Sequence, residues 1–196
     1  EIELVEGEVG ALMNFAVKLA ELVPVFTEKR SKFARGLALL GVESDWQTGK
    51  VKVDNDANAR LEVLKLAQVR GDSLLLLQNA LKKTAKAGDV KQLVKDLQSL
   101  RSYVEFGKVF AESAATEKAL SKIEEVLGVA TKLQEIWKLQ ALWEELVEKA
   151  EVLSNNVLAK NLVVCADEAE EALCKLMAKG ELSVIVYNVV AWLYQS

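Results

Sequence analysis

The residues that most enzymes use for proton transfer and metal binding are scarce in this chain of 196 residues. It contains no histidine and two cysteines, Cys165 and Cys174. Without histidine, Ser-His-Asp triads, Cys-His dyads and histidine-based zinc or di-iron sites are excluded. The cysteine spacing matches neither a CxxC redox motif nor a zinc site, so we expect two buried free thiols. No metal site and no cofactor are expected.

Four carboxylates close together are the best remaining arrangement for acid and base chemistry. Neighbouring positions on a helix point to different faces, so these side chains do not converge on one substrate atom. A solvated acidic surface fits the pattern better than a paired-carboxylate active site, and we expect the chain not to be an enzyme. The four carboxylates are Asp167, Glu168, Glu170 and Glu171.

Tryptophans are the other group that could form a ligand site. Large apolar rings can line a cavity between helices, so a small-molecule carrier is one hypothesis. At helical spacing, however, such side chains are more often core residues or interface anchors. The three concerned are Trp137, Trp143 and Trp192.

Basic residues gather in the middle of the chain. Residues 57–102 hold nine Lys and Arg against four acids, giving +5, whereas the whole chain has a net charge of -4. Such a region binds phosphate or lipid head groups, each cation adding about 1 kcal/mol near an anionic membrane, or it is a solvated helix face. Because the chain is acidic and few aromatic residues lie nearby, we expect no nucleic-acid binding. The candidate lipid-binding residues are Lys82, Lys83, Lys86, Lys91, Lys95 and Arg101.

These residues are predicted to lie on long helices. One proline and ten glycines in the whole chain do not suit turn-rich sandwiches or barrels. Apolar residues recur every three or four positions, which is typical of helices. We therefore predict an all-α, antiparallel bundle in a single domain, residues 1–196. The helices are expected near residues 3–40, 57–87, 89–127 and 130–194, with bends at Pro24, Asn155 and Gly180.

Glycines set the expected boundaries between these helices. Gly71 is a candidate break, Gly88 ends one helix before Asp89 caps the next, and Gly128 forms a turn. Residues 41–56 lack a helical period and are expected to form a surface loop. The β-branched stretch 183–187 is assigned to a helix because no partner strand is visible elsewhere.

One long stretch has the spacing of a coiled coil. Its apolar residues alternate in steps of four and three, which suits knobs-into-holes packing. They are Leu139, Trp143, Leu146, Ala150, Leu153 and Val157.

Short motifs along the chain resemble the BAR domains of the sorting-nexin type. The segment from Phe33 to Gly41 is similar to the end of the first helix of that family, and Leu93 to Leu127 is similar to its second helix. Trp143 lies near the place of a recurrent tryptophan, and residues 186–195 resemble the closing helix. The resemblance implies a three-helix protomer with an arm tip at residues 127–132, which dimerises into a curved body that rests on anionic membranes.

We expect a homodimer, because the apolar stripes exceed what a thin three-helix rod can bury within itself. The function hypothesis is a non-enzymatic, BAR-like scaffold that associates with anionic membranes or partner proteins. It would be cytoplasmic, or peripheral on endosomal membranes. The alternative is an engineered or generated helical bundle without an evolved ligand. The candidate dimer-interface residues are Phe33, Leu37, Leu40 and Trp192.

Overall fold

The chain is all-α, as predicted. The computed structural model describes residues 5–26, 58–109, 114–150 and 156–195, of which 88% are helical, and within these ranges there is no strand. The stretch 183–187 is helical, as expected. The helices are α1 (Val9–Leu22), α3 (Ala59–Leu81), α4 (Ala87–Gly107), α5 (Ala114–Ala150), α6 (Asn156–Ala178) and α7 (Glu181–Gln195).

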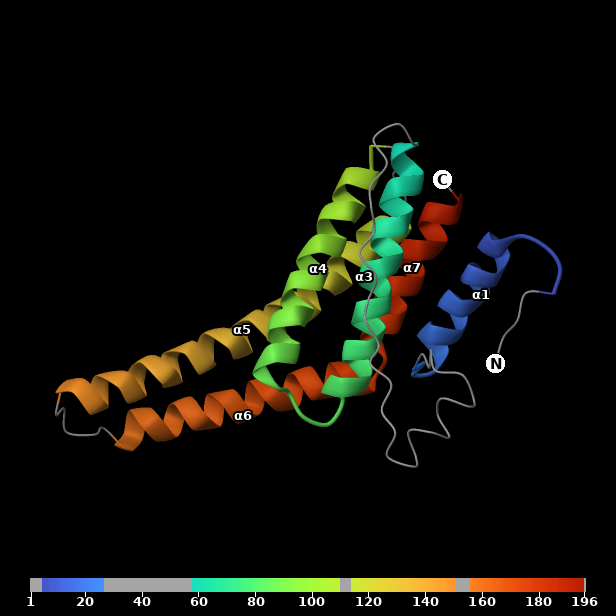
Figure 1. Ribbon diagram of the computed structural model, residues 1–196. Coiled ribbons are helices and arrows are strands. Elements are labelled where there is room, and N and C mark those ends of the chain that lie inside the picture. The colour runs from blue at the N-terminus through green and yellow to red at the C-terminus, as the bar shows by residue number, and fades with distance from the viewer. Residues whose placement is uncertain (1–4, 27–57, 110–113, 151–155, 196) are drawn as a thin grey trace, which may run out of the picture.

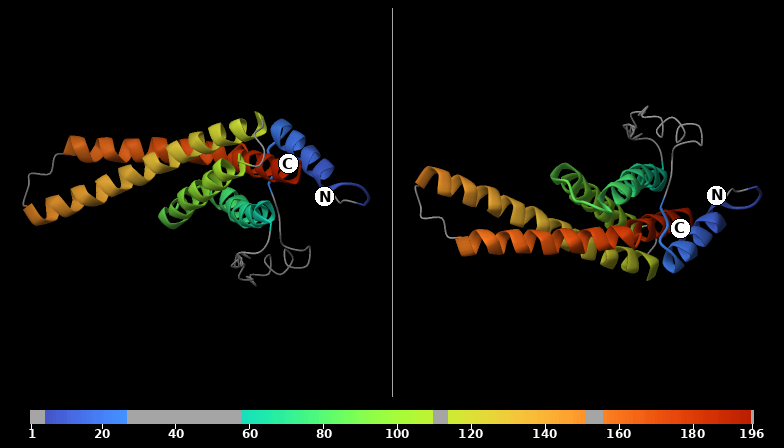
Figure 2. Two further views of the ribbon diagram at one scale, coloured as in Figure 1. Left: turned by 90° about the horizontal axis from the view of Figure 1, so that it is seen from above. Right: turned by 90° about the horizontal axis from the view of Figure 1, so that it is seen from below.

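The described helices form a body and a projecting arm (Figure 1). In the body, α3, α4, α7 and the first part of α5 pack around one apolar core, and α1 lies along α7. The arm consists of the second part of α5 and the first part of α6, which run antiparallel. Figure 2 shows the arm from above and below, standing clear of the other helices.

The first helix ends where proline stops it. The pyrrolidine ring of Pro24 disfavours helical geometry at the preceding residue, and Val23 is accordingly extended, with φ -139° and ψ 147°. The bend expected at Pro24 is therefore a helix end. The rest of the predicted helix to residue 40 and the predicted loop 41–56 lie outside the described residues, apart from the short segment up to residue 26.

Helix α3 is unbroken where a break was predicted at Gly71. Its amino end is capped by Asn58, whose side chain accepts a hydrogen bond of 2.9 Å from the backbone N–H of Arg60. A methyl group added to Gly71 would lie 2.7 Å from Cγ1 of Val186 on α7. The glycine therefore lets two helices approach closely and does not end α3.

Helix α4 begins and ends earlier than the predicted helix 89–127, and its carboxyl end lies against a tryptophan. Lys86 is its N-cap, so the predicted cap Asp89 lies in the first turn, where its charge is favourable near the positive end of the helix. At the other end, a methyl group on Gly107 would lie 2.4 Å from the Trp192 ring.

The predicted turn at Gly128 is wrong, because α5 continues through it to Ala150. A helix of 37 residues spans about 55 Å. The arm tip expected at residues 127–132 therefore lies within this helix. The bend at Gly180 is confirmed: its φ is +82°, which favours glycine, and α6 and α7 meet there at 51°.

Two polar networks lie inside the body. The carboxylate of Asp96, with no exposed surface, accepts hydrogen bonds from Arg70 Nη1 at 3.0 Å, Ser73 Oγ at 2.6 Å and Gln92 Nε2 at 2.9 Å. The second network joins Gln78 of α3 to Ser183 of α7, with Gln78 Nε2 donating to Ser183 Oγ at 2.9 Å. The first network joins the consecutive helices α3 and α4, and the second joins α3 to α7, which is distant in sequence.

Candidate functional site

The four carboxylates of α6 lie in different surroundings. Glu170 accepts hydrogen bonds from the backbone N–H of Ala85 at 2.8 Å and from Thr84 Oγ1 at 3.3 Å, which fastens the α3–α4 connection to α6. Glu171 pairs with Lys175 one turn later, and the hydrogen bond from that lysine lowers the pKa of Glu171. Asp167, Glu168 and Glu171 are exposed, as expected for a solvated acidic surface, whereas Glu170 is half-buried.

The cysteines differ from the prediction of two buried thiols. Cys165 is exposed on the arm, and Cys174 is half-buried near the body. Burial raises the pKa of the Cys174 thiol, and the charge of Glu170 raises it further. Within the described residues, no group of three His, Cys, Asp or Glu side chains is arranged to hold a metal ion.

Five of the predicted lipid-binding residues are exposed, at the α3–α4 connection and along α4. Lys82 Nζ lies 4.8 Å from the centre of the Phe26 ring, a cation–π contact. None of the five lysines forms an ion pair with a carboxylate in the described part of the chain. We call these residues the basic patch: Lys82, Lys83, Lys86, Lys91 and Lys95.

The sixth predicted residue, Arg101, is engaged elsewhere. It is only half-exposed, and its guanidinium pairs with Glu105 at 3.0 Å and with Glu124 of α5 at 2.9 Å. These partners raise the pKa of Arg101. The structure therefore does not bring Arg101 into the basic patch.

Of the four predicted dimer-interface residues, Trp192 alone lies within the described part of the chain, and it is buried. Trp192 lies in the core with 5% of its surface exposed, and its ring packs against Gly107. This burial removes Trp192 from the predicted interface. The other predicted interface residues, Phe33, Leu37 and Leu40, lie outside the described residues.

The arm carries exposed apolar residues that were not among the predicted dimer-interface residues. Among the side chains described, none after Ile136 on α5 and none before Ala166 on α6 is buried. Trp137 still packs against the core, and Trp143 is half-exposed on the arm. The exposed large apolar residues there have 41% to 67% of their surface open to solvent. We call them the arm patch: Leu139, Leu142, Leu146, Val157, Leu158, Val163 and Val164.

The first part of α6 contributes much of the exposed apolar surface of the arm. Residues 156–166 contain a single charged residue, Lys160, so this stretch is apolar on nearly every side. A helix with apolar residues all round is normally buried, whereas here α5 is the only described helix that lies along this stretch. The four-three spacing of Leu139 and Leu146 was the signal for this surface, but it predicts a packing stripe and not its occupant.

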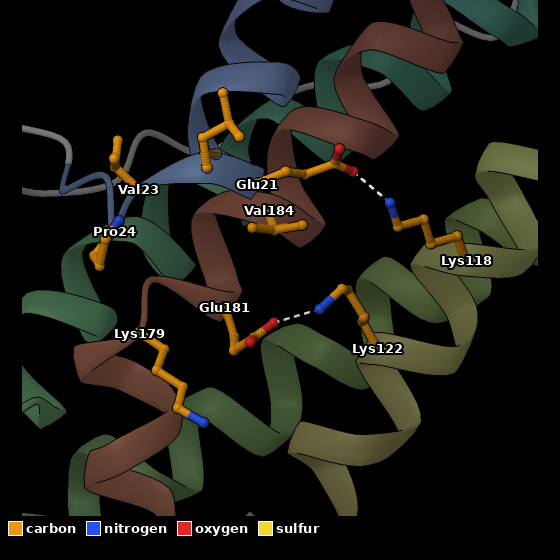
Figure 3. Close-up of a pocket in the computed structure, with 10 residues that line it drawn as sticks. Glu21, Val23, Pro24, Lys118, Lys122, Lys179, Glu181 and Val184 are labelled. Carbon is orange, nitrogen blue, oxygen red and sulfur yellow. Dashed lines mark hydrogen bonds and ion pairs between the residues drawn. The ribbon is translucent and has the colours of Figure 1, made fainter.

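A hollow of about 450 Å³ lies between α1, α5 and the α6–α7 turn. Figure 3 shows its charged side chains, in which Lys118 pairs with Glu21, and Lys122 pairs with Glu181 at 2.6 Å. Lys179 lines the same hollow without an ion pair in the described part of the chain. Because the two carboxylates already neutralise two of the three lysines, the hollow works mainly as an ion-paired seam between these helices.

No single helix in the described ranges combines the length and the apolar character needed to cross a bilayer. Among the described helices, the bent pair Val157–Ala178 and Glu181–Tyr194 meets this test when the two are taken together.

Comparison of the chain with protein-family models, with curated proteins and with solved structures finds no match.

Proposed function

We propose that this protein is a non-enzymatic helical scaffold that binds another protein chain through the arm patch. The observation that carries the proposal is the exposure of seven Leu and Val side chains on a two-helix arm. Single exposed apolar residues are ordinary on protein surfaces, but a group of this kind on one projecting element is typical of an interaction site.

The physical reason is the geometry of a helix pair. Each helix in a pair has a neighbour on one side only, so the outer apolar residues stay in contact with water. Additional helices packed on the arm would bury them, at about 25 cal/mol for each Å² of apolar surface removed from water. The arm is electrically balanced, since residues 137–149 and 156–165 contain three lysines and three glutamates. Charge therefore does not oppose the approach of a second helical surface.

A photo-crosslinking experiment tests this function in cells that express the full chain. p-Benzoylphenylalanine replaces Leu142 in the arm patch, and in the control protein it replaces Glu144, which lies on the opposite side of α5. We expect position 142 to crosslink to one protein that mass spectrometry identifies. The adduct should disappear when Leu139→Glu and Leu146→Glu are added.

The control position defines the result that would contradict the proposal. Equal labelling at positions 142 and 144, or no protein adduct at position 142, would show that the arm patch is not a protein-binding surface. The second result would favour a helical bundle without an evolved ligand.

A second function, association with anionic membranes, is favoured by the basic patch. Its five exposed lysines have no carboxylate partner within the described residues, so their charge is available to a surface of phosphate head groups. This function agrees with the BAR-type resemblance, which stays a prediction. The nearby carboxylates Asp89 and Glu170 weaken the local positive potential, so we expect salt-sensitive binding.

Vesicle co-sedimentation tests the membrane function. Vesicles with phosphatidylserine should retain the protein at low ionic strength, and vesicles of phosphatidylcholine alone should not. The triple variant Lys83→Glu, Lys86→Glu and Lys91→Glu should lose this binding with unchanged helicity. Lys18→Glu, on the exposed side of α1, is the matched control. Binding that is indifferent to the triple change would exclude the basic patch as a lipid site.

A further inference from the structure

We infer that the chain covering the arm patch is a second copy of this protein, with the two α5 arms antiparallel and a twofold axis at Leu142. This inference rests on the proposed function, because it names the partner of the same surface. It replaces the interface predicted from Phe33, Leu37, Leu40 and Trp192.

A single stripe on α5 carries the inference. Its members follow one another in steps of four, three, four and three residues, so they lie along one side of the helix. All five are exposed. From the amino end they are Glu135, Leu139, Leu142, Leu146 and Lys149.

Two antiparallel copies of this stripe are complementary to each other in charge and in apolar character. Glu135 lies seven residues before Leu142, and Lys149 lies seven residues after it. An antiparallel pair centred on Leu142 therefore sets Glu135 of each copy beside Lys149 of the other, while Leu139 meets Leu146. An isologous interface requires a patch of this self-complementary kind.

The stripe is also accessible over the length that pairing needs. One heptad before Glu135 the same side of α5 carries Gly128, where an added methyl group would meet no atom within 4 Å. Figure 2 shows that no other described helix crosses the arm. Within the described part of the chain, Glu135 has no ion pair, and Lys149 pairs with Glu145 of its own helix, at 2.5 Å.

Symmetry then positions the remaining apolar residues. A twofold axis that makes the two α5 helices antiparallel keeps both α6 helices on the same side of that pair. The arms consequently form a four-helix bundle, in which a helix that is apolar on nearly every side gains neighbours. The two bodies lie at opposite ends, so the dimer is elongated.

Analytical ultracentrifugation of the full chain tests the dimer and its register. The wild type should form an elongated dimer, and Leu142→Glu should be monomeric, because it sets two carboxylates at the twofold axis. Lys149→Glu should raise the dissociation constant about tenfold, since both symmetric ion pairs become repulsive. Adding Glu135→Lys to that variant should restore the wild-type value. Glu144→Lys, on the opposite side of α5, should leave the dimer unchanged.

A disulfide at the twofold axis provides a second test that does not depend on variant stability. With Cys165→Ala and Cys174→Ala in place, Leu142→Cys should crosslink two copies on mild oxidation, because a disulfide needs Cα atoms roughly 4.4–6.8 Å apart. Glu144→Cys is the control and should not crosslink.

The outcomes separate this inference from the proposed function. A monomeric wild type, a dimer that survives Leu142→Glu, or crosslinking at position 144 instead of 142 would overturn the inference. If position 142 nevertheless captures a different, identified protein in the photo-crosslinking experiment, the proposed function stands. If it captures no protein, both fall.

Discussion

The ion pair between Arg70 and Asp96 offers the sharpest test of the energetics of the body. The Asp96 side chain is fully buried, whereas 31% of the Arg70 side chain is exposed. Ser73 and Gln92 also donate to the carboxylate, but both are neutral. The two partners therefore differ in solvation: the Asp96 carboxylate is stabilised by its protein hydrogen-bond donors, whereas the Arg70 guanidinium can also contact water.

This asymmetry gives the expected magnitudes. Arg70→Met keeps an apolar stem of similar length but leaves a buried carboxylate with neutral donors only. Removing one partner of a buried pair costs about 3–5 kcal/mol, and the two remaining donors place this variant at about 3 kcal/mol. In the double variant Arg70→Met and Asp96→Leu no buried charge remains, and the half-exposed Ser73 and Gln92 can bind water. We expect the double variant to cost about 1 kcal/mol, less than the single one.

Urea unfolding followed by circular dichroism measures these differences. All variants should carry Leu142→Glu, so that dimerisation does not contribute to the apparent stability. Arg101→Met, which removes two ion pairs with solvent-exposed glutamates, is the control and should leave the midpoint nearly unchanged. A cost below about 1 kcal/mol for Arg70→Met, or a double variant less stable than the single one, would refute the reasoning.

Three further outcomes follow from the structure. Gly71→Ala should destabilise the fold by about 1–3 kcal/mol, because the added methyl group would overpack the contact with Val186. Gly128→Ala should stabilise the fold by about 0.5–1 kcal/mol, because this position is helical and the methyl group would meet open space. Urea unfolding midpoints compare the two variants. Gly180→Ala should cost about 1–2 kcal/mol in the same assay, because its φ of +82° is unfavourable for a side chain. Iodoacetamide at pH 8 should alkylate exposed Cys165 before Cys174, since a raised pKa leaves less Cys174 thiolate, and peptide mass spectrometry gives the order. Equal rates for the two thiols would contradict the described burial.

The sequence alone predicted the features that depend on the local backbone. Scarce proline and glycine with apolar steps of three and four predicted an all-α chain, and the structure confirms it. Pro24 marked an interruption of the first helix, because its ring acts on the residue directly before it, although the expected bend is the end of α1. Gly180 marked a bend, because only glycine readily adopts its positive φ.

Features that depend on residues distant in the chain became visible in the folded structure and not in the sequence. Gly71 and Gly128 look alike in sequence, yet one admits Val186 of α7 and the other faces open space. Trp192 was expected at an interface and instead packs in the core, while Leu139 has core spacing and is exposed. Periodicity shows which residues share one side of a helix. It does not show what covers that side, because burial depends on elements that approach from elsewhere in the chain, or from another chain.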